Sequence, residues 1–255
     1  MLALLLLASA TLAASPDLGQ LRQGWEGWQG LLASQGRMPV ALREVDLAQV
    51  AAGEVARQRE KLGGTDRVVG AAWSALPRDA LWVAILDDAC HTLVKGLTER
   101  HLAPELPGQK ILYQHLRLPW PLSARQWIID IRNNDSLYRS SAGGLWERTW
   151  TLAERREERA AMIGEAGFPE PGAVWTPLNE GGWLLLDVGE GTLLVYHGRA
   201  DVGGAVPAEL STRFALSTLE ELLRGVIERA EQVSGHYRTG HTPVVRPDGS
   251  AIAPW

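Results

Sequence analysis

The sequence predicts an α+β fold in which a curved antiparallel sheet is wrapped around one long C-terminal helix. Residues 211–233 carry an apolar stripe, with Leu219 and Leu223 in it, at the three- and four-residue spacing of an amphipathic helix. Residues 183–188 and 192–199 have the pattern of two strands joined by a three-residue turn. Strands with short links pair antiparallel, and the helix stripe has only the sheet as a large surface to bury itself against.

The other elements follow from a change in the period of the apolar residues. Up to about residue 110 the spacing is mostly helical, and beyond it apolar and polar residues alternate as they do in strands. The predicted helices are 16–32, a segment that begins at Pro77, and the charged stretch 154–165. The predicted strands are 53–59, 67–74, 111–118, 127–131 and 146–152.

The composition excludes several classes of function. The chain has 255 residues, a formal net charge of −5 and 45% apolar residues, which is typical of a globular protein. The acidic balance argues against nucleic acid as a partner, because phosphate binding needs a basic face. A single cysteine, Cys90, excludes an intrachain disulfide and a multi-cysteine zinc site. HExxH, GxSxG and P-loop signatures are absent, so we predict no catalytic residue, no metal ligand and no cofactor.

The two ends of the chain differ from the middle. Residues 1–13 are apolar and uncharged and predict a signal peptide, since they are too short for a helix to span the ~30 Å of membrane hydrocarbon. A periplasmic or secreted location follows. The alternative is a cytoplasmic protein whose hydrophobic N-terminus packs on the domain. Residues 16–234 form the predicted domain, and residues 235–255, rich in proline and glycine, predict an extended tail.

Three titratable features receive structural interpretations. His115 and His197 lie on predicted strands, where isolated histidines are more often hydrogen-bonded structural residues than ligands. Asp87-Asp88 ends the second predicted helix, which favours a solvated turn over a metal site.

Two irregular stretches determine shape. Residues 118–125 (LPWPLSAR) form a stiff corner between two strands, because two prolines remove backbone donors and fix the turn. Residues 201–207 link the last strand to the long helix; their glycines allow positive φ and Pro207 suits a helix start.

These stretches, in this order, resemble the START domains, the steroidogenic acute regulatory protein-related lipid-transfer family. The resemblance runs from about Gly53 to Ala230. It rests on Leu81-Trp82 in the second helix, the Pro119-Trp120-Pro121-Leu122-Ser123-x-Arg125 corner, Gly182-Trp183, Gly191-Thr192 leading to Tyr196, and Asp201-x-Gly203-Gly204-x-x-Pro207. Val202 and Glu209 depart from the family pattern at the entrance to the last helix.

The resemblance implies a helix-grip fold of a bacterial, exported type, with a hydrophobic tunnel between the sheet and the last helix. Such domains bind one lipid or sterol-like molecule, with transient membrane contact, and are generally not enzymes. Two alternatives stay open: an enzyme on the same fold, such as a polyketide cyclase or aromatase, and a filled domain used for protein interaction. The enzyme would need an acid and a base converging in the cavity, from His115, His197 or Tyr196.

We expect the tunnel wall to come from the sheet and from the long helix. Strand parity turns Trp127, Ile129 and Ile131 inward, away from Asp130 and Arg132. Tyr113 and Tyr196 are expected to offer hydroxyls to a ligand head group. Leu219 and Leu223 complete the predicted lining from the helix. Ligand entry requires a hinge, for which Asp201, Gly203 and Gly204 are the candidates.

Overall fold

The computed structural model describes residues 15–87, 96–102, 106, 108–164, 167–204 and 206–255. The predicted signal peptide, 1–13, lies outside the described residues. The helices are α1 (Leu18–Gln35), α2 (Glu44–Ala51), α3 (Arg78–Leu86), α4 (Asp135–Ser140), α5 (Arg156–Ala160), α6 (Ala208–Glu231) and α7 (Val233–His236). The strands are β1 (Ala56–Glu60), β2 (Arg67–Ser74), β3 (Leu97–His101), β4 (Gln109–Leu116), β5 (Arg125–Asn133), β6 (Leu145–Leu152), β7 (Val174–Trp175), β8 (Leu178–Val188) and β9 (Gly191–Asp201).

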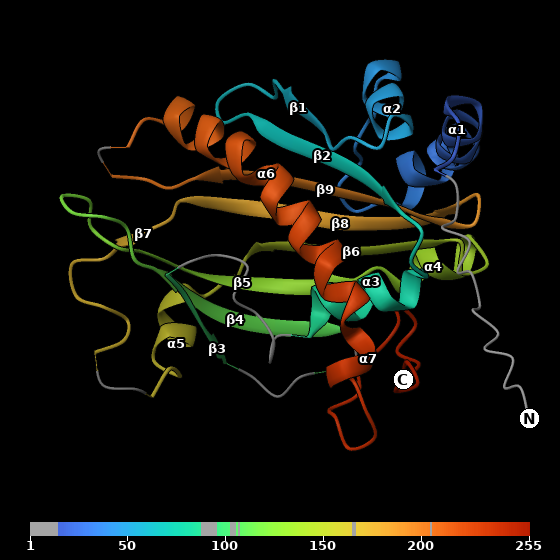
Figure 1. The fold of residues 1–255 in the computed structure, drawn as a ribbon. Coiled ribbons are helices and arrows are strands. Elements are labelled where there is room, and N and C mark those ends of the chain that lie inside the picture. Colours follow the sequence, from blue (N-terminus) through green and yellow to red (C-terminus); the bar gives the residue numbers. More distant parts are fainter. Residues whose placement is uncertain (1–14, 88–95, 103–105, 107, 165–166, 205) are drawn as a thin grey trace, which may run out of the picture.

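The strands form one sheet, and α6 lies across it. Within the described residues the strand order is β1-β2-β9-β8-β6-β5-β4-β3, with every neighbouring pair antiparallel and only the short β7 parallel to β5. Figure 1 shows α6 running diagonally over the strands, with α3 beside its C-terminal half. The predicted α+β architecture, an antiparallel sheet with one long C-terminal helix packed on it, is confirmed.

The two faces of the sheet bury separate apolar clusters. The face that carries α3 and α6, called here the inner face, buries the side chains of Trp183, Leu185 and Leu194. The outer face is covered by α1 and α2, which bury Leu184, Leu186 and Val195. Because consecutive residues of β8 point to opposite faces, the run 183–186 serves both clusters, as strands covered on both sides do.

Several predicted boundaries move. The predicted helix 154–165 reduces to the five residues of α5, and α2 was not predicted because eight residues are too few to show a helical period clearly. The long helix begins at Ala208 with Pro207 as its N-cap residue, as proline geometry favours. It ends at Glu231, before Gly235, and a short turn of helix, α7, continues through that glycine.

The C-terminal residues fold back onto α3. Tyr237 is buried, donates a hydrogen bond from its hydroxyl to the Ile252 carbonyl (3.0 Å) and accepts one from the Val244 amide (2.7 Å). Trp82 on α3 donates from Nε1 to the Val245 carbonyl at 2.9 Å. The predicted extended tail is therefore ordered, and it contributes buried residues to the inner-face core.

None of the helices in the described part of the chain has the length and apolar character that crossing a bilayer requires.

Candidate functional site

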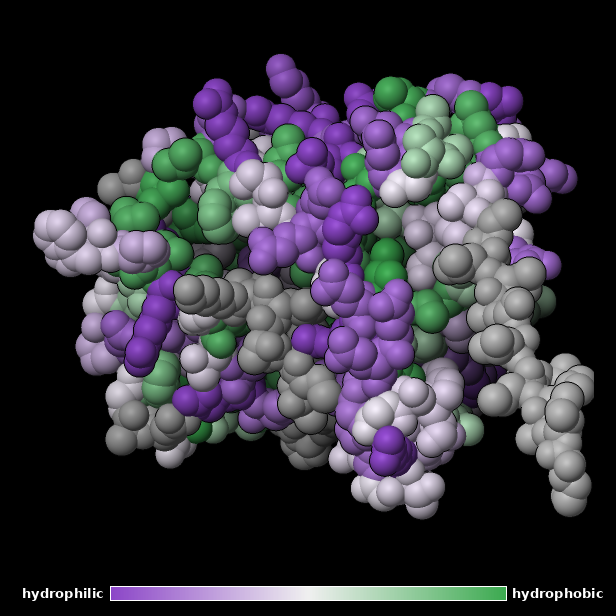
Figure 2. All heavy atoms as spheres, in the orientation of Figure 1, coloured by the Kyte–Doolittle hydropathy of each residue, from purple (hydrophilic) through white to green (hydrophobic). Residues whose placement is uncertain are grey.

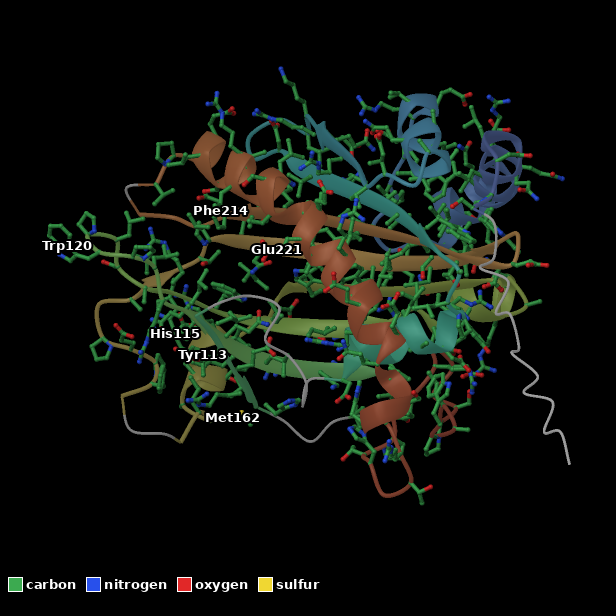
Figure 3. All side chains as sticks on the ribbon, viewed as in Figure 1. Tyr113, His115, Trp120, Met162, Phe214 and Glu221 are labelled. Carbon is green, nitrogen blue, oxygen red and sulfur yellow. The ribbon has the colours of Figure 1, made fainter. Side chains whose placement is uncertain are left out.

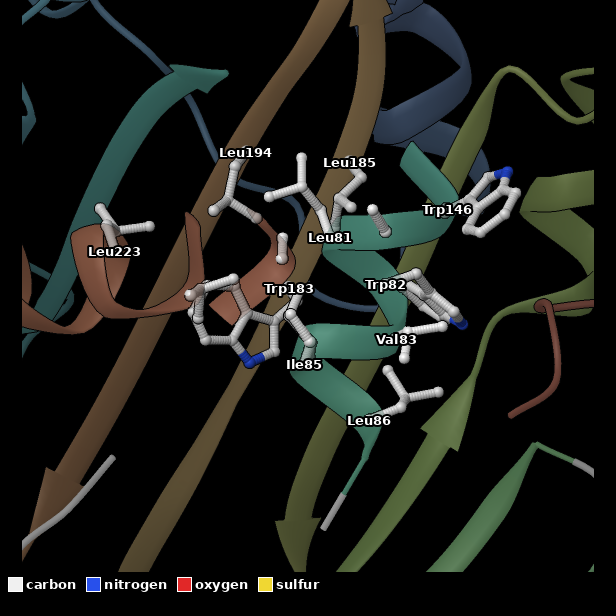
Figure 4. Packing of buried hydrophobic residues seen from close by; sticks show 14 of the residues in the cluster. Leu81, Trp82, Val83, Ile85, Leu86, Trp146, Trp183, Leu185, Leu194 and Leu223 are labelled. Atoms are coloured by element: carbon white, nitrogen blue, oxygen red, sulfur yellow. The ribbon is translucent and has the colours of Figure 1, made fainter. Parts of the chain in front are cut away.

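Where α6 crosses β2 and β9 it rests directly on the strands. Leu219 and Leu223 are buried in the same cluster as Trp183, Leu185 and Leu194 of the sheet. Figure 4 shows Leu223 with these three residues. At Gly70 of β2 the approach is so close that a Cβ atom would lie 2.7 Å from Leu219 Cγ and 2.8 Å from Leu223 Cδ1. The two leucines predicted to line a tunnel from the helix are thus packed into the core.

A second apolar cluster lies on the inner face farther along the sheet. Leu112, Trp127, Ile129 and Ile131 form it, on β4 and β5. We call these four residues the apolar strip. In the register, Ile129 pairs with Leu152 and Ile131 with Trp150, and Trp150 also packs against the core under α6. The predicted inward orientation of Trp127, Ile129 and Ile131 is confirmed; their contact with a ligand stays a prediction.

Tyr113 points the other way, so its predicted role in the cavity is wrong. It pairs with Ile128, whose side chain shares its face, whereas Trp127 pairs with Gln114 on the inner face. On the outer face Tyr113 packs edge-on against Phe168 and Trp175 (Figure 3 labels Tyr113). Its hydroxyl donates to Gln126 Oε1 at 2.9 Å, and burial raises its pKa to about 12.

Tyr196 does lie on the inner face. Its ring contacts Trp183 (4.8 Å between centroids) and Trp150 (5.8 Å). Burial raises the pKa of Tyr196 to about 12, so its hydroxyl stays protonated near neutral pH and is suited to hydrogen bonding.

The two histidines of the predicted strands lie on the outer face. His115 Nε2 is 2.7 Å from Glu170 Oε2, and its ring packs against Phe168. His197 is buried, and burial lowers its pKa to about 3, which leaves it neutral. Because Tyr196 faces the opposite side of the sheet, these three residues do not converge as an acid–base set. The described residues also contain no cluster of three or more ligating side chains suited to a metal.

The predicted hinge is tied to the proline-rich corner by one arginine. Gly203 and Gly204 have φ of +68° and +67°, and Asp201 Oδ1 accepts a hydrogen bond from the Gly203 amide at 2.9 Å. Arg125, the last residue of the corner and 2% exposed, donates to the Gly203 carbonyl at 3.2 Å and to the Ser123 carbonyl at 2.5 Å. The predicted hinge segment is thus held both by the side chain of Asp201 and by the neighbouring Arg125.

Large apolar side chains are exposed beside this hinge. Trp120 at the corner is 92% exposed and Phe214 on α6 is 67% exposed, and both lie toward the same end of the molecule (Figure 3). Leu122 and Leu210 are exposed as well. In Figure 2 apolar side chains gather around the beginning of α6, beside the paler tip of the corner. We call Trp120, Leu122, Leu210 and Phe214 the exposed apolar end.

A cavity of about 750 Å³ opens at the other end of β4 and β5. It lies between the end of α3, the strands β3 to β6 and the C-terminal segment 240–245. Its polar and charged lining includes Asp87, His101, Lys110, Asn133, Arg148 and His241. None of the residues predicted to line a tunnel is among the described residues of this lining.

Sequence reasoning missed this polar cavity for two reasons. Lys110 stands two residues before Leu112, and Asn133 two residues after Ile131, so strand parity already placed both on the inner face. Both residues lie just outside the predicted strands 111–118 and 127–131, so the alternation was not followed as far as either of them. The contribution of 240–245 had no signal at all, because its position depends on the fold of the tail.

The fold of the described residues is similar to that of several solved proteins. No family model and no curated protein matches the chain. Human STARD10 is similar to it with a TM-score of 0.56 at 11% identity, covering 70% of this chain and 69% of that one. The STAR-related lipid transfer protein from Xanthomonas axonopodis, a fragment, gives 0.55 at 17% identity, covering 70% and 94%. Human StAR-related lipid transfer protein 5 gives 0.51 at 13% identity, covering 84% and 98%. These likenesses establish that the chain has the START-type, helix-grip fold.

Proposed function

We propose that this protein is a non-catalytic carrier of one lipid or other hydrophobic small molecule, bound on the inner face of the sheet. The observation that carries the proposal is the apolar strip, which forms a cluster of its own on the inner face, joined through Trp150 to the core under α6. An apolar ligand on this strip gains ~0.8 kcal/mol for each CH₂ group removed from water. The solved relatives with this fold include proteins named for lipid transfer.

The separation of His115, His197 and Tyr196 argues against the enzyme that would have used these three residues as its acid and base. His115 and His197 lie on the outer face, and Tyr196 faces inward without either of them. A general acid or base must lie within hydrogen-bond reach of the proton that it transfers, so residues on opposite faces of the sheet cannot serve one reaction together.

The exposed apolar end supports contact with a membrane during loading and release. Trp120 at the tip of a proline-stiffened corner keeps most of its ring in water, although burying an aromatic side chain is favourable. Tryptophan is the aromatic side chain typical of the membrane–water interface. The corner lies next to the hinge, where a ligand would enter.

Two measurements test the carrier. Native mass spectrometry of the purified protein should show one bound lipid, or uptake of one from vesicles. A fluorescent-lipid transfer assay between vesicles should then slow severalfold in Trp120→Ala. Trp255→Ala is the matched control, since Trp255 is also exposed but lies on the C-terminal tail. A protein that never carries lipid contradicts the proposal and favours the interaction domain; equal effects of the two variants contradict the role of the corner.

A further inference from the structure

Arg125 is a buried cation whose partners are all neutral. It is 2% exposed, and its guanidinium donates to three backbone carbonyls, those of Ser123 (2.5 Å) and Ala124 (3.4 Å) from Nη1 and that of Gly203 (3.2 Å) from Nη2. Its Nε is buried without a hydrogen-bond partner, and no aspartate or glutamate in the described part of the chain forms an ion pair with it. Because buried charges are normally paired, Arg125 lacks a partner of opposite charge.

The incompletely used edge of Arg125 is the one with which other arginines of this protein bind carboxylates. Nε and Nη2 lie side by side on the planar guanidinium and can donate to two oxygens of one anion. Arg132 binds Asp130 in this way, at 3.0 Å from Nε and 2.6 Å from Nη2. Arg246 binds Asp79 with the same two nitrogens, at 3.3 Å and 2.8 Å. At Arg125 this edge has one neutral carbonyl, so it is suited to an anion with two oxygens.

This edge of Arg125 lies close to the surface at the exposed apolar end. Gly204 is exposed, and a Cβ atom on it would lie 3.4 Å from Arg125 Nη2. Trp120, on the corner that ends at Arg125, is 92% exposed (Figure 3). Tryptophan side chains lie at the head-group level of a bilayer, which is also the level of the lipid phosphates. A membrane bound at Trp120 would therefore bring phosphate groups to the side of the molecule where Arg125 lies.

From these observations we infer that Arg125 is a phosphate-binding residue, at which the phosphate group of a phospholipid replaces the Gly203 carbonyl on the Nε–Nη2 edge. The inference rests on the proposed carrier function and specifies how its entrance is regulated. The exchange replaces a hydrogen bond to a neutral carbonyl by a bidentate pair between two charged groups, whose bonds are about twice as strong. The segment 201–204 keeps its internal bond from the Gly203 amide to Asp201 but is no longer tied to the corner by Arg125.

The direct test follows the Nε–Hε signal of Arg125 by NMR of the full chain, assigned through its loss in Arg125→Lys. The probes are dihexanoylphosphatidylcholine, dihexanoylglycerol, which has the same chains without phosphate, and inorganic phosphate. The signal should shift saturably with the phospholipid and stay in place with dihexanoylglycerol. A shift with inorganic phosphate as well assigns the site to the phosphate group itself, whereas a shift with inorganic phosphate alone overturns a lipid as its source.

Calorimetry with the same probes separates this inference from the carrier function. If the phospholipid binds while the Arg125 signal does not move, the inference is overturned and the carrier function stands. If neither lipid binds, the result counts against both.

A transfer assay tests the role of Arg125 at a membrane. The unaltered protein should transfer a fluorescent lipid severalfold faster from vesicles of phosphatidylcholine than from vesicles of digalactosyldiacylglycerol, which has no phosphate. Arg125→Lys keeps the charge but cannot present two donors in one plane, so the ratio of the two rates should fall to about one. Arg117→Gln is the matched control, because Arg117 is an exposed arginine directly before the corner, and it should keep the ratio. Equal loss of the ratio in both variants would indicate general attraction of charge and refute the assignment.

A second variant leaves Arg125 in place. Asp201→Ala removes a side chain that holds the Gly203 amide and a negative charge from the same segment. It should lower the phospholipid concentration that half-saturates the Arg125 shift severalfold. Melting curves verify that each variant is folded. An unchanged half-saturating concentration in folded Asp201→Ala would contradict the opening of the segment by phosphate, even if Arg125→Lys does not fold.

Discussion

The contact between α6 and β2 at Gly70 can be tested by adding one methyl group. In Gly70→Ala the new Cβ would meet Leu219 Cγ at 2.7 Å and Leu223 Cδ1 at 2.8 Å, where carbon atoms normally keep about 3.5–4.0 Å. Both leucines are buried to within 1% of complete, so neither can swing into solvent. Overpacking of this kind costs about 1–3 kcal/mol, part of which the stiffer unfolded chain of the alanine variant offsets by about 0.4–1 kcal/mol.

A second substitution makes the reasoning quantitative. Leu223→Ala alone should cost about 2–5 kcal/mol, because it removes a fully buried side chain and leaves a cavity. That cavity lies where the methyl group added at Gly70 needs room. The double variant should therefore be more stable than the sum of the single effects predicts, by about 1 kcal/mol, because the contact of the added methyl group with Leu219 remains.

Urea unfolding followed by tryptophan fluorescence measures all four proteins of this cycle. Gly27→Ala is the control for the glycine substitution itself, because Gly27 lies on the exposed side of α1 with no atom within 4 Å of its added Cβ. It should be stabilised by up to about 1 kcal/mol through helix propensity. Additivity of the two core substitutions to within about 0.5 kcal/mol would refute direct contact of the helix with the strand.

Two further predictions concern stability. The pKa of His197 is about 3 in the folded chain and 6.5 when unperturbed. Between pH 6.5 and 3 the unfolded state therefore binds a proton at His197 and the folded state does not. The free energy of unfolding should fall by up to about 1.4 kcal/mol for each pH unit as the pH is lowered through this range. Denaturant titrations across this range should show the slope, and a folded His197→Gln with the same slope would contradict it. Tyr237→Phe leaves the Val244 amide and the Ile252 carbonyl without their partner, so unfolding should cost about 1–3 kcal/mol less; an unchanged melting curve would show that the tail does not stabilise the domain.

Strand periodicity predicted the sheet and the three residues of the apolar strip that lie on β5. The alternation at Trp127, Ile129 and Ile131 was sufficient to assign their face, because a strand has only two faces and Asp130 and Arg132 occupy the other. Tyr113 was assigned by its hydroxyl rather than by its register, and the register places it opposite. Side-chain chemistry is a weaker guide to orientation than parity.

The polar cavity was not predicted, because its lining depends on contacts between distant parts of the chain. Arg148 faces the cavity because β6 is antiparallel to β5 and pairs Arg148 with Asn133. The segment 240–245 reaches the same place because Tyr237 and Trp82 hold the tail. Neither contact leaves a pattern within a short window of sequence. Arg148 and the segment 240–245 come together only in the folded structure.

The single guanidinium of Arg125 has a consequence for how two parts of the fold move. The arginine begins β5 directly after the corner that bears Trp120, and it holds the backbone of the glycine segment that leads into α6. Through this one side chain, the corner that exposes Trp120 and the start of the longest helix are mechanically connected, so a displacement of either one must be accommodated at Arg125.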